Sequence, residues 1–189
     1  VSSLLTDALT PTSNDTNSFA DLLIRKTGGN PFFINEFLQT TYKDRLIEFS
    51  SEKGEWIWDI SGIELSQVTD NVVDLVAKKI ANLPEKAQEI LKLGACIGSY
   101  FNIEALYKVC EKDKDDILLA LNEVIQEGML NKVDDTFKFS HDRVFEAAYS
   151  LISENEKSLL HYRIGMHSLE NKDKKELHEN IFYIVNQLN

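Results

Sequence analysis

The chain has 189 residues, which is enough for one or two compact domains that each bury a core. Its 43% hydrophobic and 27% charged residues are ordinary for a soluble globular protein, and no apolar run suggests a membrane span or a signal peptide. The 31 acidic and 20 basic side chains give a net charge of −11, which repels nucleic acid and anionic lipid where no local basic stripe overrides it. The sequence has no such stripe. We therefore expect a cytoplasmic protein without a nucleic-acid partner or a membrane segment.

The cysteines and the chain ends carry further information. Cys96 and Cys110 lie in apolar helical stretches without CxxC spacing, which predicts buried, reduced thiols rather than a disulfide. The chain begins at Val1 rather than at Met, and it finishes within an apolar-periodic segment, residues 181–188. We expect both ends to lie inside a longer polypeptide.

The first part of the chain predicts two short helices. Residues 10–18 are polar turn formers and predict a loop, after which a helix ends at Gly28 and Gly29. Asn30 is then predicted to cap a second helix, with Pro31 at its first position, where the missing N–H costs nothing. The apolar faces of the two helices contain Phe19, Leu22, Leu23, Phe33, Ile34, Phe37 and Leu38.

A small β-hairpin is predicted over residues 46–60, because alternating apolar residues flank a polar segment. Trp56 and Trp58 lie on one face of its second strand, which predicts packing onto the preceding helices rather than ligand binding. A further helix is predicted over residues 71–82, with Val72, Val76 and Ile80 on its apolar face.

Three helices and a second hairpin follow Pro84. The first helix carries Ala87, Ile90, Leu91, Gly94 and Ile97; the second spans residues 103–110; and the third spans residues 113–128, with Ile117, Leu118, Leu121, Val124 and Ile125 as its apolar positions. A hairpin over residues 129–139 turns at Asp134 and Asp135. Three helices followed by a hairpin form the outline of a winged helix.

The last part of the chain predicts three more helices. Ser140 is predicted to cap the first, which buries Val144, Ala148 and Ile152, and Ser153 and Glu156 form a capping box for the second. The apolar face of the second helix is predicted to be Leu159, Tyr162, Met166 and Leu169, and that of the third to be Leu177, Ile181, Ile184, Val185 and Leu188. The last two helices are typical of the start of an antiparallel helical array.

Three segments carry a resemblance to a known family. The sequence KTGGNPFF at residues 26–33 resembles the GNP[FY] signature in the lid of STAND ATPases, the signal-transducing NTPases with numerous domains. Residues 83–101, from LP to GxxF, resemble the start of their winged helix, and FKFSHDRV at residues 137–144, followed by AAY, resembles its closing motif. The order and spacing of the three agree over roughly residues 19–165. The chain is most similar to the module found in large multidomain sensor kinases, of which the hairpin at 46–60 and the ending at 179–188 look typical.

This resemblance implies a mainly α fold of the AAA+ type. It implies that residues 1–70 form a helical lid with a β-hairpin, that residues 71–152 form a winged-helix domain, and that residues 153–189 begin a TPR-like helical array. The partners that it implies are an upstream ATPase core and flanking domains of the same polypeptide, together with protein partners of the C-terminal helices.

The resemblance also implies a nucleotide site. Pro31 is expected to pack against the adenine of bound ADP or ATP, with the backbone of Gly29 and Asn30 close by, which fits the close approach that glycines permit and the N–H groups of a helix start. His141 is expected to contact the β-phosphate of ADP, as a donor of a charge-assisted hydrogen bond. Arg143 either contacts phosphate or pairs with Asp142. A simple break between helices and a surface histidine near a cap remain the alternatives.

The chain lacks other parts of an ATPase. It has no GxxxxGK[ST] loop and no strand that ends in acidic Mg²⁺ ligands, so an upstream core is expected to hold the Mg²⁺ and most of the nucleotide. We expect no catalysis by this chain alone. The predicted function is that of a regulatory fragment of a signal-transducing ATPase, which closes over bound ADP or ATP and relays the switch to flanking kinase or interaction domains.

The sequence also bears on two other functions and on a metal site. A DNA-binding winged helix is disfavoured because residues 113–128 carry five acidic side chains and a single Lys114. A protein-interaction scaffold without nucleotide sensing stays open. A metal site built from His161, His167 and His178 is disfavoured because these histidines lack HExxH or CxxC context.

Overall fold

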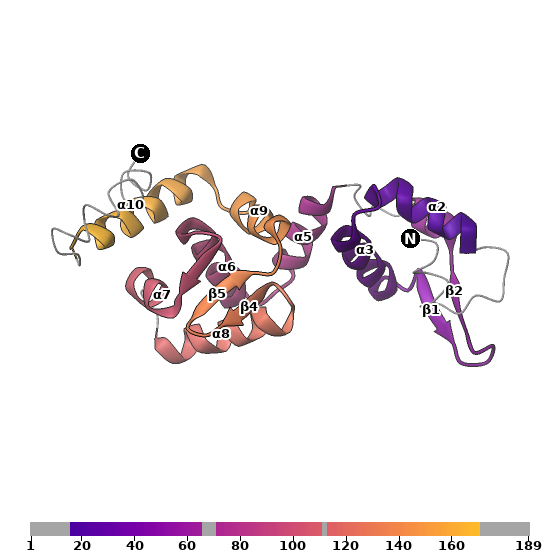
Figure 1. Cartoon of the computed structure of the whole chain (residues 1–189), viewed down its shortest axis with the longest axis horizontal. Coiled ribbons are helices and arrows are strands. Elements are labelled where there is room, and N and C mark those ends of the chain that lie inside the picture. The colour runs from indigo at the N-terminus through magenta and orange to yellow at the C-terminus, as the bar shows by residue number, and fades with distance from the viewer. Residues whose placement is uncertain (1–15, 66–70, 111–112, 171–189) are drawn as a thin grey trace. The chain divides into compact units, whose positions relative to one another are not determined.

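The computed structural model describes residues 16–65, 71–110 and 113–170, which are mainly helical with two small antiparallel sheets (Figure 1). The predicted mainly α class is confirmed. The chain divides into two compact units, Val1–Val76 and Ala77–Asn189, and helix α5 (Val72–Ala81) contains the boundary. The helix predicted around residues 177–188 lies outside the described residues.

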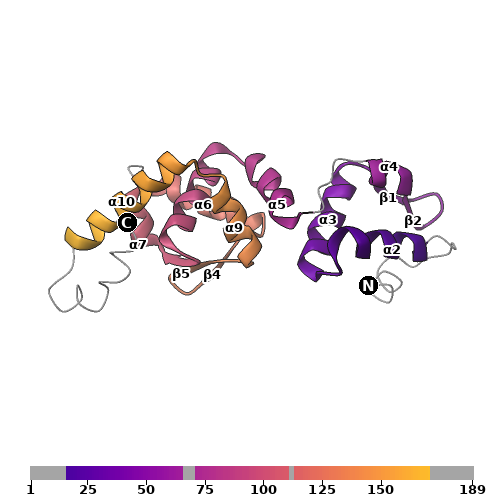
Figure 2. The same ribbon diagram turned by 90° about the horizontal axis from the view of Figure 1, so that it is seen from above.

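Residues 16–65, the part of the first unit before α5 that the structure describes, form helices α2 and α3, a hairpin and the short helix α4 (Figure 2). These elements are α2 (Thr16–Thr27), α3 (Pro31–Lys43), β1 (Ile47–Ser50), β2 (Glu55–Trp58) and α4 (Ile60–Leu65). Helix α2 begins inside the loop predicted for residues 10–18, and α4 was not predicted. The hairpin pairs Ile47 with Trp58, in the position expected from the alternation.

The hairpin packs on the helices through its tryptophans, as predicted. The ring of Trp58 stacks on that of Phe19 with centroids 4.9 Å apart, and Trp56 meets Tyr42 edge to face at 5.9 Å. The buried core of this unit consists of Phe19, Ala20, Leu22, Leu23, Phe33, Phe37, Ile47, Ile63 and Leu75.

From Glu85 to Glu170, the described residues of the second unit follow the predicted order of three helices and a hairpin, and two more helices come after the hairpin. The elements are α6 (Glu85–Ile97), β3 (Tyr100–Asn102), α7 (Ile103–Val109), α8 (Lys114–Gln126), β4 (Leu130–Val133), β5 (Thr136–Phe139), α9 (Asp142–Ser150) and α10 (Glu154–Glu170). Strand β3 was not predicted. It joins the hairpin to give a sheet of order β3-β5-β4, so that β5 is the middle strand.

Helix α6 is the central element of this unit, because it packs against α7, α8, α9, α10 and β3. It comes close to β3 at Gly94, where a Cβ atom would lie 2.5 Å from Cε1 of Phe101. Phe101 is itself buried and stacks on Phe137 of the middle strand, with ring centroids 5.9 Å apart. The glycine therefore sets how closely α6 lies against the sheet.

Two predictions of buried helix faces are wrong in part. On α10, Leu159 and Tyr162 are 50% and 55% exposed, and the side chain buried against α6 is Ile164 instead. On α8, Leu118 was predicted to belong to the apolar face but is 42% exposed. In both helices apolar residues occupy more than one face, so the spacing alone does not select the buried one.

We predict that Gly94→Ala destabilises the chain. A steric cost of about 1–3 kcal/mol equals or exceeds the roughly 1 kcal/mol that alanine gains over glycine inside a helix, and the Cβ contact with the buried ring is severe, so a net loss of stability is expected. Urea denaturation measures the difference. In a Phe101→Leu background, where the ring is gone, the same substitution is expected to cost less; an equal cost in both backgrounds would show that the ring is not the obstacle.

Candidate functional site

The Gly-Gly-Asn-Pro turn between α2 and α3 has a backbone that only certain residues adopt readily. Gly28 and Gly29 have φ angles of +61° and +74°, in the left-handed region. A Cβ atom at either position would meet nothing within 4 Å, so backbone conformation rather than crowding calls for glycine. The open space also leaves the backbone of this turn approachable from outside.

Asn30 and Pro31 start α3 as the sequence predicts. The side-chain Oδ1 of Asn30 accepts a hydrogen bond from the backbone N–H of Phe33 at 3.1 Å, and Pro31 occupies the first helical position. Both residues are exposed. The turn thus presents an apolar pyrrolidine ring beside a glycine backbone, which is a surface on which a flat ring can pack.

His141 lies at the start of α9, but in a different role from the predicted one. It is the N-cap of the helix, and its Nδ1 accepts a hydrogen bond from the backbone N–H of Arg143 at 3.1 Å. Ser140 was predicted as the cap and is not: its Oγ is buried and makes no hydrogen bond with any described residue. The predicted cap was therefore wrong by one residue.

The capping hydrogen bond determines the tautomer of His141. A ring nitrogen that accepts a hydrogen bond carries no proton, so the proton of the neutral imidazole resides on Nε2. His141 follows β5, the middle strand of the sheet, with one residue between them, so the position of its backbone is well defined. A donor in a fixed orientation at a helix N-terminus, where the helix dipole is positive, is chemically suited to an anion.

Arg143 does not pair with Asp142, which was one of the two predicted alternatives. Its guanidinium Nη1 forms an ion pair with Oε2 of Glu146, one turn further along α9. Both side chains are about half exposed, so this pair contributes little to stability. Among the five predicted site residues, Gly29, Asn30 and Pro31 meet at one turn in the first unit, while His141 and Arg143 meet at one helix start in the second.

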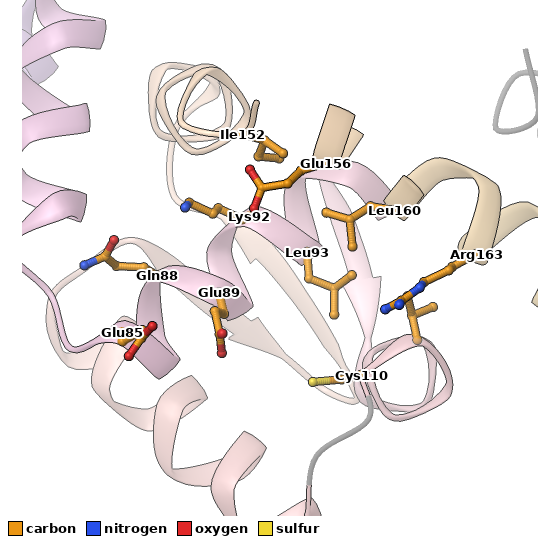
Figure 3. A pocket seen from close by; sticks show the side chains of 11 residues that line it. Glu85, Gln88, Glu89, Lys92, Leu93, Cys110, Ile152, Glu156, Leu160 and Arg163 are labelled. Carbon is orange, nitrogen blue, oxygen red and sulfur yellow. The ribbon is translucent and has the colours of Figure 1, made fainter. Parts of the chain in front are cut away.

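A hollow of about 610 Å³ in the second unit was not predicted (Figure 3). It lies between α6, the end of α7 and α10, and none of the five predicted site residues lines it. Leu93 and Leu160 are among its apolar lining residues, and its charged lining residues are of both signs: Glu85, Glu89, Lys92, Glu156 and Arg163. The nearby Lys92 helps to lower the pKa of Glu156, after the larger effect of hydrogen bonds from Ser153. No sequence motif marks this hollow.

The two cysteines form no disulfide with each other, as predicted. Cys96 is buried beside Ile152 and Ile164, and burial raises the pKa of its thiol to about 11. It therefore stays protonated at neutral pH and is a poor nucleophile. Cys110 is half-buried.

The described histidines of α10 do not form a metal site. His161 shares a hydrogen bond of 3.0 Å between its Nε2 and the hydroxyl of Tyr149, which ties α10 to α9. Within residues 16–65, 71–110 and 113–170, no three His, Cys, Asp or Glu side chains gather where they could hold a metal ion. His178 lies outside the described residues. None of the described helices combines the length and the apolar character that crossing a bilayer requires.

Comparison with known proteins relates the chain to signalling kinases. It is 26% identical over 204 residues to "Hybrid signal transduction histidine kinase G" of Dictyostelium discoideum, a match that covers 87% of this chain and 6% of that protein. It is 25% identical over 194 residues to "Peroxide stress-activated histidine kinase mak3" of Schizosaccharomyces pombe, covering 97% of this chain and 8% of that protein.

These matches support the prediction of a kinase-type signalling protein. The chain spans less than a tenth of the length of either relative, which agrees with the expectation of flanking domains on the same polypeptide. No protein-family model matches the chain, and no solved structure matches it.

We predict that substitutions at the start of α9 separate the two candidate caps. His141→Ala is expected to lower the free energy of unfolding by about 1 kcal/mol, as for the loss of an N-cap, whereas His141→Asn keeps a capping acceptor and costs less. Ser140→Ala removes a buried hydroxyl that has no partner, so it is expected to be neutral or stabilising. Urea denaturation distinguishes the two; a large loss for Ser140→Ala alone would restore Ser140 as the cap.

We also predict that Cys96 is unreactive in the folded chain. In a Cys110→Ser variant, a thiol reagent at about pH 8 is expected to label the remaining thiol only after unfolding. Burial keeps this thiol protonated and also keeps the reagent from reaching it. Labelling is followed by absorbance with and without urea. Equal rates under the two conditions would contradict the buried position.

Proposed function

We propose that this chain is a regulatory segment of a larger signalling kinase and that it senses ADP or ATP. In this proposal residues 1–70 are the lid of a STAND-type ATPase, residues 71–152 are its winged helix, and residues 153–189 begin a helical array. An ATPase core elsewhere in the polypeptide holds the Mg²⁺ and most of the nucleotide. The chain itself performs no catalysis; it contributes contacts that report which nucleotide is bound.

The observation that carries the proposal is the position of His141. Its Nδ1 is occupied by the cap of α9, so Nε2 is the donor, and the ring stands at the positive end of a helix. This is the chemistry that a phosphate oxygen requires, and it matches the role that the family resemblance implies for this residue. Arg143 is paired with Glu146, so we assign it only a secondary contribution to charge.

The Gly-Gly-Asn-Pro turn supports the proposal independently. Its glycines leave the backbone approachable, and the exposed Pro31 offers an apolar ring to a purine. The capped start of α3 holds that ring in place, since Asn30 fixes the first turn. We assign adenine contact to Pro31, with Gly29 and Asn30 beside it.

The proposal is tested by calorimetric titration of ADP into a longer polypeptide that includes the ATPase core. His141→Ala and His141→Asn are both expected to weaken the binding of ADP by roughly ten- to a hundredfold. This is the equivalent of about 1.5–3 kcal/mol for one charge-assisted hydrogen bond. Pro31→Ala is expected to weaken ADP binding less, because this substitution removes only packing area.

A matched control is Asn102→Ala. Asn102 caps α7 in the same way, with Oδ1 accepting from the N–H of Ala105 at 2.8 Å, but it has no part in the proposed site. Its substitution is expected to lower stability and leave ADP affinity unchanged. Equal ADP affinity for the wild type and both His141 variants would remove the nucleotide-sensing role.

A protein-interaction scaffold is the second candidate function. The observation in its favour is the exposure of Leu159 and Tyr162 on α10, which leaves apolar surface available to a partner. The affinity of a scaffold for its partners does not depend on nucleotide. Equal binding of partner proteins with and without ADP would therefore favour the scaffold function. DNA binding is not favoured, because α8 exposes acidic side chains.

A further inference from the structure

The outward face of α8 combines apolar and acidic side chains. The inward face buries Ile117, Ala120, Leu121 and Val124, each at most 2% exposed. On the opposite face Leu118 and Leu119 are 42% and 63% exposed, although both are large and apolar. Isolated exposed leucines are common, but two adjacent ones on a helix whose core face is already satisfied leave apolar area without a function in the fold.

The side chains around these leucines are acidic or neutral. Asp115 lies one turn before Leu118 and Leu119, and Glu123 one turn after Leu119, so the leucines and the carboxylates share one exposed surface. We call this surface the α8 face; it consists of Asp115, Leu118, Leu119, Asn122, Glu123 and Gln126.

The charge of the α8 face is not neutralised from within α8. The only cation in this helix is Lys114, and its Nζ lies over the ring of Tyr107, 5.1 Å from the centroid. The other carboxylate of the first turn, Asp116, is bound to Lys86 at 2.9 Å and points away from the face toward α6. Asp115 and Glu123 therefore give the face a negative potential around an apolar centre.

This combination excludes several occupants. Nucleic acid and an anionic membrane are repelled by the carboxylates. A second copy of the chain, docked through the same face, would place Asp115 and Glu123 of both copies together, and like charges across an interface are costly. The surface that complements the α8 face is therefore an apolar one bordered by cations. A helix with leucine-type residues on one side and lysine or arginine beside them has such a surface.

We propose that the α8 face is a docking site for a basic amphipathic helix of a partner protein. Leu118 and Leu119 supply the apolar contact, and Asp115 and Glu123 pair with the cations that border the apolar stripe of the partner. The site is separate from the proposed nucleotide contacts, because none of its residues belongs to them. The charges mainly accelerate association and select the partner, while the leucines hold it.

The test uses the whole chain and two model peptides. One is an amphipathic peptide of leucine and lysine of roughly 14 residues, about four helical turns, and the other carries glutamate in place of every lysine. Fluorescence anisotropy of the labelled peptides measures affinity at two salt concentrations. We expect the lysine peptide to bind, more weakly at the higher salt concentration, and the glutamate peptide not to bind.

Variants locate the binding. Two double variants are each expected to weaken the binding of the lysine peptide by about tenfold or more. One is Leu118→Ser with Leu119→Ser, and the other is Asp115→Lys with Glu123→Lys. A charge-matched control is Glu104→Lys with Asp135→Lys, which makes the same change in net charge at exposed positions outside α8. The apolar control is Leu159→Ser, a leucine of similar exposure on α10. Circular dichroism confirms that each variant is folded.

The outcomes decide the proposal. Loss of binding in the two α8 variants but not in the two controls supports a specific α8 site. Equal weakening in the charge-matched control shows that the peptide follows net charge alone and overturns the proposal, as does the absence of any binding by the lysine peptide. Dimerisation in sedimentation equilibrium that depends on Leu118 and Leu119, or binding to vesicles of phosphatidylserine and phosphatidylcholine, assigns the face to a second copy or a membrane and also overturns it.

Discussion

The middle strand of the second unit fixes the positions of most of the elements around it. Because β5 pairs with β3 on one side and with β4 on the other, its backbone cannot shift without breaking two ladders. Phe137 and Phe139 are buried, and both contact the ring of Phe101, which in turn lies against Gly94 of α6. The strand thus joins the sheet to the central helix through a continuous layer of aromatic rings.

The same strand determines where the proposed phosphate contact lies. Beyond Phe139 the chain is held by a further hydrogen bond, from the N–H of Ser140 to the carbonyl of Met129 at 3.0 Å, and the next residue is His141. Because β5 is paired on both sides, the backbone position of His141 is well defined, and the capping hydrogen bond then fixes the orientation of its ring. Precision of this kind is what a group needs if it is to distinguish two nucleotides that differ by one phosphate.

Local signals in the sequence were enough to predict the features that depend on a few neighbouring residues. The end of α2 at Gly28, the cap at Asn30 and the box of Ser153 and Glu156 all involve hydrogen bonds within a few positions, so residue type and spacing reveal them. The first hairpin followed from alternation, and the second from the apolar segments on either side of Asp134 and Asp135. His141 was predicted as a site residue from the family resemblance, but not as a cap, because serine is the commoner capping residue and stood next to it.

The features that the sequence did not reveal depend on distant parts of the chain. Strand β3 has three residues and exists because β5 offers an edge, some 35 residues later, with which it pairs. The buried face of α10 is chosen by the position of α6 rather than by spacing, since Leu159 and Ile164 both fit a helical period. The hollow beside Cys110 likewise arises from the meeting of three helices, and no motif encodes it.

The most direct measurement of the central claim is the tautomer of His141, observed by nitrogen-15 NMR of the imidazole ring. A single neutral tautomer with the proton on Nε2 is expected, together with a coupling across the hydrogen bond from the N–H of Arg143 to Nδ1. In the polypeptide that includes the ATPase core, the Nε2 signal is expected to shift when ADP binds, while that of His161 does not. A proton on Nδ1, rapid exchange between tautomers, or an Nε2 signal indifferent to ADP would contradict the assignment of His141 as the nucleotide contact.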